Sequence, residues 1–248
     1  MGLKRRVGAA LHRTRSRLRP PASALVTVNV AKQLGLEWIL DIGANRGQFA
    51  ERMRRVGFDG RILSLEPVSD AFAQLAAASA DDPRWTIEQT AVGATPGTAT
   101  IHVAGNSVSS SMLPMEQRHL DLAPQSAYGR DEEVPVTTVL AVLDGHGIDP
   151  ASVLLKADVQ GYEAAVLDGA GDRLPEVAAL LLELSIVPFY EGQPLLPEML
   201  ARLTASGHLL WNLFPEGLTR HDGRLLWGDG LFVRADLAPE VIADRNAR

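Results

Sequence analysis

The sequence predicts an α/β fold: a doubly wound, mostly parallel sheet with helices on both faces. Short apolar runs with the length of strands alternate along the chain with segments of helical periodicity. Parallel strands that follow one another need crossover connections, and these helices supply them. The last two apolar runs, at residues 209–214 and 230–234, are joined by a short segment rich in turn residues, which favours an antiparallel hairpin.

The expected strands are apolar runs bounded by glycine, proline or polar residues. They cover residues 38–42, 61–66, 85–92, 153–158, 178–185, 209–214 and 230–234, with an extension of the third strand at residues 98–103. The expected helices cover residues 48–56, 69–80, 163–169 and 197–206. Ser69 is a candidate N-cap for the second of these helices, and Gly207 is expected to end the last.

Length and composition limit the classes of protein to consider. The 248 residues suit one large α/β domain and are few for two. The absence of cysteine excludes disulfides, thiolate nucleophiles and cysteine-ligated zinc. It also fits a reducing compartment, and we expect a cytoplasmic protein.

Charge is unevenly distributed along the chain. The net charge is −6, yet the first 36 residues contain eight basic residues and no acidic one. We therefore expect a basic N-terminal arm over residues 1–30, able to form a helix, followed by one domain over residues 31–240. The arm either contacts an anionic membrane surface or a partner, or is a solvated leader. The acidic remainder of the chain repels polyanions, which argues against nucleic acid as a substrate.

One stretch lacks the alternation of strands and helices. Residues 105–130 are rich in serine and other polar residues and have few periodic apolar positions. A structureless segment of this length in a compact domain is commonly a lid or a binding loop. Because ligands of open α/β sheets lie beyond the carboxyl ends of the strands, we expect a lid over that crevice at residues 104–132. Asn106 and Ser110 are its candidate substrate contacts.

A glycine-rich turn follows the first expected strand, where the chain reads Asp41-Ile-Gly-Ala-Asn-Arg-Gly47. Glycines at such a turn allow the close approach of a ligand. A carboxylate beside the turn would repel the phosphates of a nucleotide, whereas S-adenosylmethionine (SAM) has a sulfonium, an ammonium and a carboxylate but no phosphate. We expect Asp41 to favour the cationic groups and the backbone N–H groups of the turn to bind the carboxylate. The candidate cofactor contacts here are Asp41, Gly43, Ala44, Asn45 and Gly47.

Two further strand ends complete the predicted cofactor site. Glu66 and Pro67, at the end of the second strand, are candidate cofactor contacts, and Glu66 can accept hydrogen bonds from both ribose hydroxyls of an adenosine. Ala91 and Val92 end the third strand with small side chains, against which an adenine ring can lie.

Acidic residues near the later strand ends are the candidate catalytic groups. Asp158 ends the fourth strand, and Glu183 interrupts an apolar strand, where an unpartnered charge is costly. Glu163 begins the next helix, either as a substrate contact or as a carboxylate favoured by the helix dipole. Lys156 is expected to pair with Asp158 or Glu183. No two histidines have the spacing of a helical metal site, and a divalent metal such as magnesium, bridging the carboxylates, is left open.

Taken in order, these segments resemble a known family. The run 41–47, followed by Leu65-Glu66-Pro67 and Ala91-Val92-Gly93, resembles the class I SAM-dependent methyltransferases. Residues 155–163 read LKADVQGYE and resemble the FkbM-type methyltransferases, which often have LKIDVEGAE there. The resemblance covers residues 38–234 and implies a Rossmann-like, seven-stranded domain, with SAM contacts at Asp41, Gly43, Asn45, Gly47 and Glu66. It also implies methyl transfer to a hydroxyl of a sugar or a polyketide-type natural product, so the expected partner is a small hydroxylated acceptor.

Three positions differ from that family pattern, and two other function classes fit parts of the sequence. The differences, at Ala157, Gln160 and Tyr162, lie near the expected site and leave the identity of the acceptor open. An NAD-dependent oxidoreductase has the same fold, but Asp41 and the lack of a third glycine in the turn disfavour it. A SAM-binding regulator without activity would act through the basic arm and would bind SAM without turnover. The sequence predicts no oligomeric state.

Overall fold

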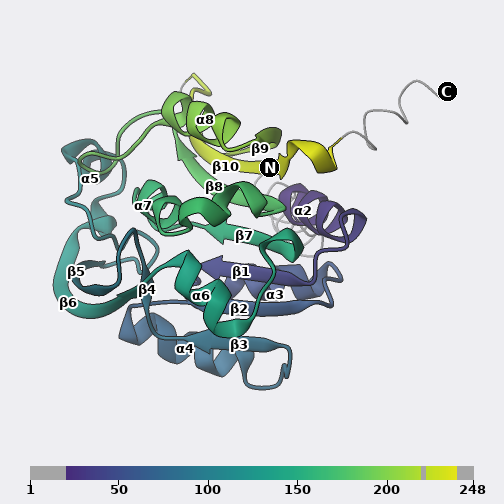
Figure 1. Ribbon diagram of the computed structural model, residues 1–248. Coiled ribbons are helices and arrows are strands. Elements are labelled where there is room, and N and C mark those ends of the chain that lie inside the picture. Colours follow the sequence, from purple (N-terminus) through teal and green to yellow (C-terminus); the bar gives the residue numbers. More distant parts are fainter. Residues whose placement is uncertain (1–20, 219–221, 239–248) are drawn as a thin grey trace, which may run out of the picture.

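A seven-stranded sheet forms the centre of the protein in the computed structural model, which describes residues 21–218 and 222–238. The strand order is β3-β2-β1-β7-β8-β10-β9 (Figure 1). The pairs β8–β10 and β10–β9 are antiparallel, and the latter is the hairpin expected near the end of the chain. The predicted doubly wound, mostly parallel α/β fold is confirmed. The strands are β1 (Trp38–Ile42), β2 (Arg61–Leu65), β3 (Trp85–Glu88), β7 (Val153–Ala157), β8 (Ala179–Ser185), β9 (His208–Leu218) and β10 (Leu225–Arg234).

Helices cover both faces of this sheet (Figure 1). Residues alternate between the faces along each strand, so Ile39 packs with one group of helices and Leu40 with the other. The Ile39 face is covered by α2 (Ala22–Gln33), α3 (Gln48–Arg55) and α4 (Ser69–Ser79). The Leu40 face is covered by α6 (Val139–His146), α7 (Glu163–Asp168) and α8 (Leu196–Ala205). The central strands are therefore buried on both sides, as their apolar sequences require.

A small second sheet stands beside the carboxyl ends of β1 and β2. Its order is β4 (Ala91–Val92), β6 (Tyr128–Thr137) and β5 (Gly97–Ala104). The third strand expected at residues 85–92 is therefore two strands in different sheets, and the expected extension at residues 98–103 is β5. The chain leaves the large sheet after Glu88 because its partner β2 ends at Leu65, directly opposite.

The segment expected to lack structure, residues 105–130, is ordered, and that expectation is wrong in this respect. It contains a bridge between His102 and Ser111, the helix α5 (Gln117–Leu122) and a turn at Pro124–Ser126. Polar side chains stabilise it in place of an apolar pattern, because Asn106 bonds to Ser109 and to the buried Ser126. Hydrophobic periodicity cannot reveal such an arrangement.

One helix boundary and one whole helix also differ from the expectation. The N-cap of α4 is Val68, and Ser69 instead bonds through its backbone N–H and its hydroxyl to Glu132 of β6. The helix α6 was not expected, and its N-cap Thr138 accepts a hydrogen bond from the backbone N–H of Ala141.

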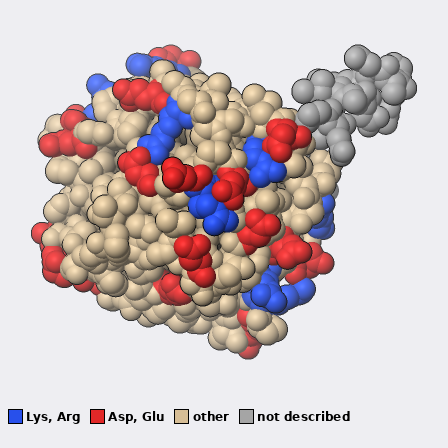
Figure 2. All heavy atoms as spheres, viewed as in Figure 1, with Lys and Arg blue, Asp and Glu red and all other residues tan. Residues whose placement is uncertain are grey.

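The first element of the described residues is α2. Val28 and Ala31 of α2 are buried against the sheet, so the expected boundary between residues 30 and 31 falls within this helix. The remainder of the basic arm, residues 1–20, and with it the predicted membrane or partner contact, lies outside the described residues. No helix in the described part of the chain is long and apolar enough to cross a membrane. Basic and acidic side chains are interspersed over the face seen in Figure 2.

Candidate active site

The loop after β1 brings the backbone close to the end of β7. Gly43 has φ +72°, and a Cβ atom there would lie 2.1 Å from the carbonyl oxygen of Asp158. Gly47 has φ +83°, and its Cβ would lie 2.7 Å from the ring of the buried Trp85. Neither position admits a side chain unless the backbone or this ring moves. The two glycines therefore fix how closely this loop packs against the sheet.

A cavity lies beside this loop, and we call it the glycine-loop cavity. Seven residues that were expected to contact a cofactor line it: Gly43, Ala44, Asn45, Glu66, Pro67, Ala91 and Val92. Residues 107, 108 and 110–112 of the expected lid line it as well. Of the two lid candidates, Ser110 lines the cavity, whereas Asn106 serves the hydrogen bonds inside the lid. Both sheets thus contribute to one enclosure at the carboxyl ends of the central strands.

Glu66 and Asn45 give this cavity its polar character. Glu66 Oε2 accepts a hydrogen bond from the backbone N–H of Asn45 at 2.7 Å, and Oε1 accepts one from Val68 at 2.9 Å. Burial raises the pKa of Glu66 to about 7, against the lowering effect of these two hydrogen bonds. The side-chain Oδ1 of Asn45 is buried and has no hydrogen-bond partner among the described residues. The cavity thus holds an unpaired acceptor and a carboxyl group with lone pairs to spare, which suits a ligand that donates hydrogen bonds.

Asp41 lies beneath the loop and does not line this cavity. Its side chain is fully buried, and its Oδ1 lies 3.1 Å from Nζ of Lys156 on the neighbouring strand. Its Oδ2 accepts a hydrogen bond from the hydroxyl of Ser64, which in turn accepts one from Trp85. The direct contact with a cationic ligand that the sequence suggested is therefore not available to this carboxylate. Its partner Lys156, expected to pair with Asp158 or Glu183, lies 3.9 Å from Asp158.

A second cavity adjoins the first, and we call it the acidic cavity. Asp158, Phe49 and Arg52 line both cavities. The other residues that line it come from the helices α2 and α3 and from the strands β8, β9 and β10. They are Ser23, Ala24, Thr27, Met53, Leu181, Glu183, Glu216, Trp227 and Asp229. Asp158 therefore stands at the junction of the glycine-loop cavity and the acidic cavity.

Glu183 and Asp229 are directly opposite each other on the antiparallel strands β8 and β10. Burial, followed by the neighbouring carboxylate of Asp158, raises the pKa of Glu183 well above its ordinary value. The same two causes raise the pKa of Asp229 to about 7. Like charges at directly opposite positions are destabilising, so this pair favours either a bound proton or a cation.

Gln160 joins Asp158 and Glu183. Its Nε2 donates to Asp158 Oδ1 at 2.8 Å and to Glu183 Oε2 at 3.3 Å, and its backbone has φ +56°. The hydroxyl of Tyr190 donates to Gln160 Oε1 at 2.8 Å and fixes the orientation of the amide. The two predicted catalytic carboxyls are therefore brought together by a residue at which the chain departs from the family pattern.

Glu163 is placed differently from the sequence suggestion of a substrate contact. It lines neither cavity, and its Oε1 accepts hydrogen bonds from the backbone N–H groups of Val159 and Gly161. Burial raises the pKa of Glu163 to about 7. The side chain therefore holds the loop that carries Asp158 and Gln160.

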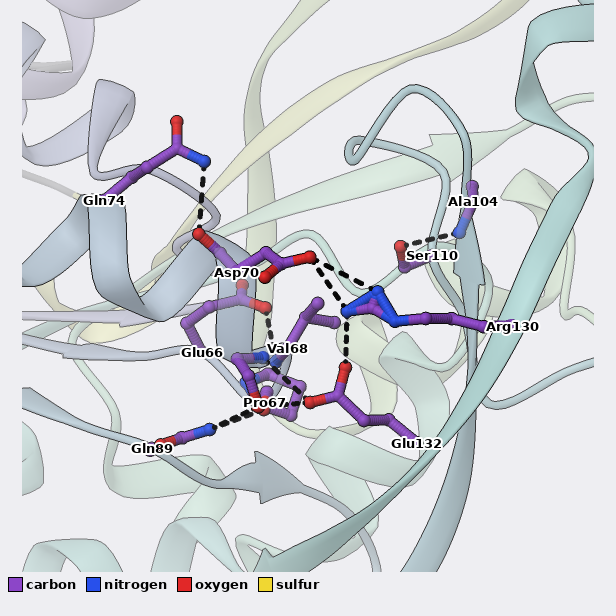
Figure 3. A network of polar contacts seen from close by, with 11 residues as sticks. Glu66, Pro67, Val68, Asp70, Gln74, Gln89, Ala104, Ser110, Arg130 and Glu132 are labelled. Carbon is purple, nitrogen blue, oxygen red and sulfur yellow. Dashed lines mark hydrogen bonds and ion pairs between the residues drawn. The ribbon is translucent and has the colours of Figure 1, made fainter.

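Two sets of contacts attach the segment that was expected to form a lid to the rest of the protein. Figure 3 shows Arg130 of β6 paired with Asp70 of α4 at 3.1 Å and with Glu132 at 2.9 Å. At the other end of the lid, the hydroxyl of the buried Ser111 donates to the backbone carbonyl of Gln160 at 2.7 Å. The lid is thereby attached both to α4 and to the loop that carries the catalytic candidates.

The described residues do not supply a metal site. Within residues 21–218 and 222–238, no group of three or more His, Asp or Glu side chains could hold a metal ion. The amide N–H of Gln160 and the ammonium of Lys156 approach Asp158, where a cation would need free oxygen ligands. The carboxyl cluster alone thus does not fit the magnesium ion that the sequence left open.

Several residues of the site were not singled out from the sequence. Asp229 interrupts the apolar strand β10 as Glu183 interrupts β8, so the same signal could have found it. Thr27 and Arg52 come from helices whose sequences give no indication of a site. They reach the cavity only because α2 and α3 pack over this part of the sheet.

Comparisons with known proteins give one matching family and several similar solved structures. Comparison with curated protein sequences gives no significant match. Among solved structures, methyltransferase FkbM from Methylobacillus flagellatus KT aligns with a TM-score of 0.49 at 17% identity, over 80% of this chain and 43% of that one. Magnesium protoporphyrin IX methyltransferase (ChlM) from Synechocystis PCC 6803, solved with bound SAM, aligns with a TM-score of 0.42 at 14% identity, over 85% and 79% of the two chains. This chain thus spans less than half the length of the FkbM structure that it matches.

The family is given by a match over most of the chain. Residues 41–210 match the family model of the methyltransferase FkbM domain. The matched region begins at Asp41, before the glycine loop, and includes Glu66, Asp158, Gln160 and Glu183. This region supplies the whole lining of the glycine-loop cavity and half of the residues that line the acidic cavity. The chain belongs to the FkbM methyltransferase family.

Proposed function

We propose that this protein is a SAM-dependent O-methyltransferase that methylates a hydroxyl group of a small molecule of the sugar or polyketide type. The observation that carries the proposal is the position of Asp158, which lines both the glycine-loop cavity and the acidic cavity. A group at the junction of a cofactor site and an acceptor site is where a methyl transfer needs a base.

The glycine-loop cavity suits SAM in its chemistry. Gly43 allows close approach of a ligand, and the unpaired Oδ1 of Asn45 can accept a hydrogen bond from it. Glu66 retains lone pairs for ribose hydroxyls, and Ala91 and Val92 offer small apolar side chains to an adenine ring. In this proposal Asp41 and Gly47 act on the cofactor indirectly, through Lys156 and through the packing of the loop on Trp85.

We assign different roles in binding and activating the acceptor to the residues around the acidic cavity. When bound, SAM supplies a methyl group on a positively charged sulfur, which keeps the electron pair of the broken S–C bond. Asp158 takes the proton that the acceptor hydroxyl loses as its oxygen forms the new bond to the methyl carbon. Glu183, which lines only the acidic cavity and is linked to Asp158 by Gln160, orients the acceptor and is not the base. Gln160 holds both carboxyls in place.

Calorimetric titration with S-adenosylhomocysteine, the product of methyl transfer, tests the cofactor, with NADH as the comparison. We expect micromolar binding of S-adenosylhomocysteine and none of NADH. Binding of NADH alone would overturn the methyltransferase proposal and support an oxidoreductase.

Turnover of hydroxylated acceptors then tests the catalytic assignment. We expect Asp158→Asn to reduce turnover by about 10²–10⁴-fold while the affinity for S-adenosylhomocysteine stays within about threefold. Turnover of the variant at the wild-type rate would remove Asp158 from the mechanism. Affinity for the cofactor product without methylation of any acceptor would favour a SAM-binding regulator. The cytoplasmic location and the contact of the basic arm with a membrane or a partner stay predictions.

A further inference from the structure

The acidic cavity has more negative charge than a neutral acceptor requires. Four carboxyl groups line it, from Asp158, Glu183, Glu216 and Asp229, against the single guanidinium of Arg52. Glu183 and Asp229 are directly opposite across two strands, and no hydrogen bond to the carboxyl of Asp229 comes from the described residues. Arg52 and Lys156, which lies 3.9 Å from Asp158, offset only part of this negative charge, and a bound cation would offset more of it.

A second feature of this cavity also indicates a ligand. Thr27 of α2 lines the cavity and is 1% exposed, yet its Oγ1 has no hydrogen-bond partner among the described residues. Buried hydroxyl groups are rarely left without a partner, because the lost hydrogen bond to water costs free energy. A threonine hydroxyl on one wall and carboxyl groups on the other suit a polar molecule with hydroxyl groups and a positive charge.

The nature of the cation follows from what surrounds the carboxyls. An amide N–H of Gln160 already donates to Asp158 and Glu183, and the ammonium of Lys156 lies 3.9 Å from Asp158. No group of three or more His, Asp or Glu side chains among the described residues could hold a metal ion, whereas an ammonium needs only single, directed hydrogen bonds to Glu183, Asp229 or Glu216.

We propose that the acceptor carries a positively charged amine, which the acidic cavity binds through Asp229 and Glu183 while a hydroxyl of the same molecule faces Asp158. This inference rests on the proposed function, since it identifies the class of the molecule to be methylated as an amino alcohol or an amino sugar. An ammonium at this position would also lower the raised pKa of Asp229, so its binding near neutral pH releases protons.

Matched pairs of amines and amides test the proposal on the full chain saturated with S-adenosylhomocysteine. The probes are glucosamine and 1-amino-1-deoxysorbitol, each compared with its N-acetyl derivative, which keeps the hydroxyls and removes the charge. We expect both amines to bind at least about tenfold more tightly than their N-acetyl derivatives in calorimetry. We also expect proton release on amine binding, measured by repeating the titration at pH 7 in buffers of different ionisation enthalpy.

Single substitutions test whether the amine binds in the acidic cavity. We expect Asp229→Asn and Thr27→Val to weaken amine binding, the former by about tenfold, because each removes one side of the proposed contact. Asp168→Asn removes an exposed carboxyl that lines neither cavity and is expected to leave amine binding unchanged. The affinity of each variant for S-adenosylhomocysteine reports whether the fold is intact.

The outcomes separate this inference from the proposed function. Failure to bind S-adenosylhomocysteine refutes the proposed function. If that ligand binds but neither amine does, or if amines and amides bind equally, the inference of a cationic acceptor is wrong. Magnesium binding that is lost in Asp229→Asn would likewise overturn it and assign the cavity to a metal.

Discussion

Lys156 Nζ lies 3.1 Å from Asp41 Oδ1 and donates hydrogen bonds to the carbonyl oxygens of Ile42 and Gly43 at 3.2 and 2.8 Å. Burial alone would lower the pKa of Lys156, but the carboxylates of Asp41 and Asp158 raise it, so the amine stays charged. Asp41, the acidic residue that opens the glycine-rich motif, therefore stabilises the loop from beneath it. It holds a lysine that in turn holds the backbone of the loop.

Removal of this lysine is expected to destabilise the protein strongly. Lys156→Met would leave the fully buried Asp41 without its cation, which we expect to cost about 3–5 kcal/mol. Urea unfolding measures the loss. Arg173→Met, which removes a surface ion pair with Glu176, is the control and should cost at most about 1 kcal/mol. A loss in Lys156→Met no larger than in this control would contradict the role given to the pair.

At position 43, the effect of a Cβ atom on neighbouring groups can be tested separately from the cost of a side chain at positive φ. Gly43 and Gly35 both have positive φ, but only at Gly43 would a Cβ meet a neighbour, the carbonyl of Asp158 at 2.1 Å. We expect Gly43→Ala to weaken binding of S-adenosylhomocysteine by at least about tenfold, as calorimetry would show. Gly35→Ala has the same strain and no collision, so its affinity should equal that of the wild type. Equal affinities of both variants would show that the close approach does not matter for binding.

Stability is expected to fall as the pH rises from about 4.5 to about 7. Burial raises the pKa of Glu163 from its usual 4.5 to about 7, so in this window the folded state binds more protons than the unfolded state. The contribution of Glu163 is complete below pH 4.5 and is lost as the pH rises through its folded pKa. Glu66 and Asp229 have pKa values raised to about 7 as well and act in the same direction.

Glu163→Gln is expected to flatten this pH dependence without abolishing it. The amide oxygen can still accept from Val159 and Gly161, but it does not titrate. Urea unfolding between pH 5 and 7.5 should show a slope smaller by up to about 1.4 kcal/mol per pH unit. Glu191→Gln changes an exposed carboxyl and serves as the control. An unchanged slope in Glu163→Gln would mean that Glu163 does not titrate in this window.

The lid is expected to loosen when its tie to the catalytic loop is cut. Ser111→Ala removes the hydrogen bond to the carbonyl of Gln160, and we expect a loss of stability of about 1 kcal/mol. Hydrogen exchange of backbone amides in residues 109–113 should become faster, while the core strands keep their protection. Thr100→Val, which removes an exposed hydroxyl bonded to Glu133, is the control. Unchanged exchange in the lid would show that this contact does not hold it.

Most of the fold could be predicted, because its elements carry local signals. The apolar runs at β1, β2, β7 and β8 were found within a residue or two of their observed bounds. The errors lie where the local sequence pattern does not show which distant segment pairs with, or holds, a stretch of chain. Residues 85–92 form one apolar run but two strands, since β2 ends before the run does. Residues 105–130 are held by the side chains of Asn106 and Ser126, which have no periodicity to detect.

The positions of some residues of the candidate site could be predicted and those of others could not, for a related reason. Seven of the expected cofactor residues line the glycine-loop cavity, because the turn after β1 and the ends of the neighbouring strands must meet at one edge of a parallel sheet. The role of Asp41 was misplaced because the direction of its side chain depends on the face of β1 that it occupies and on Lys156 across the sheet.

The sequence by itself determined the α/β class, the glycine loop and the acidic residues that follow the strands, since these depend on short-range pattern and on strand order. Only the tertiary structure decided which carboxyls face one another. Glu183 and Asp229 are 46 residues apart and become neighbours through the register of β8 with β10. Thr27 and Arg52 join them because α2 and α3 pack on that face. Such contacts depend on the register and packing of distant segments, and these follow from burial over the whole domain.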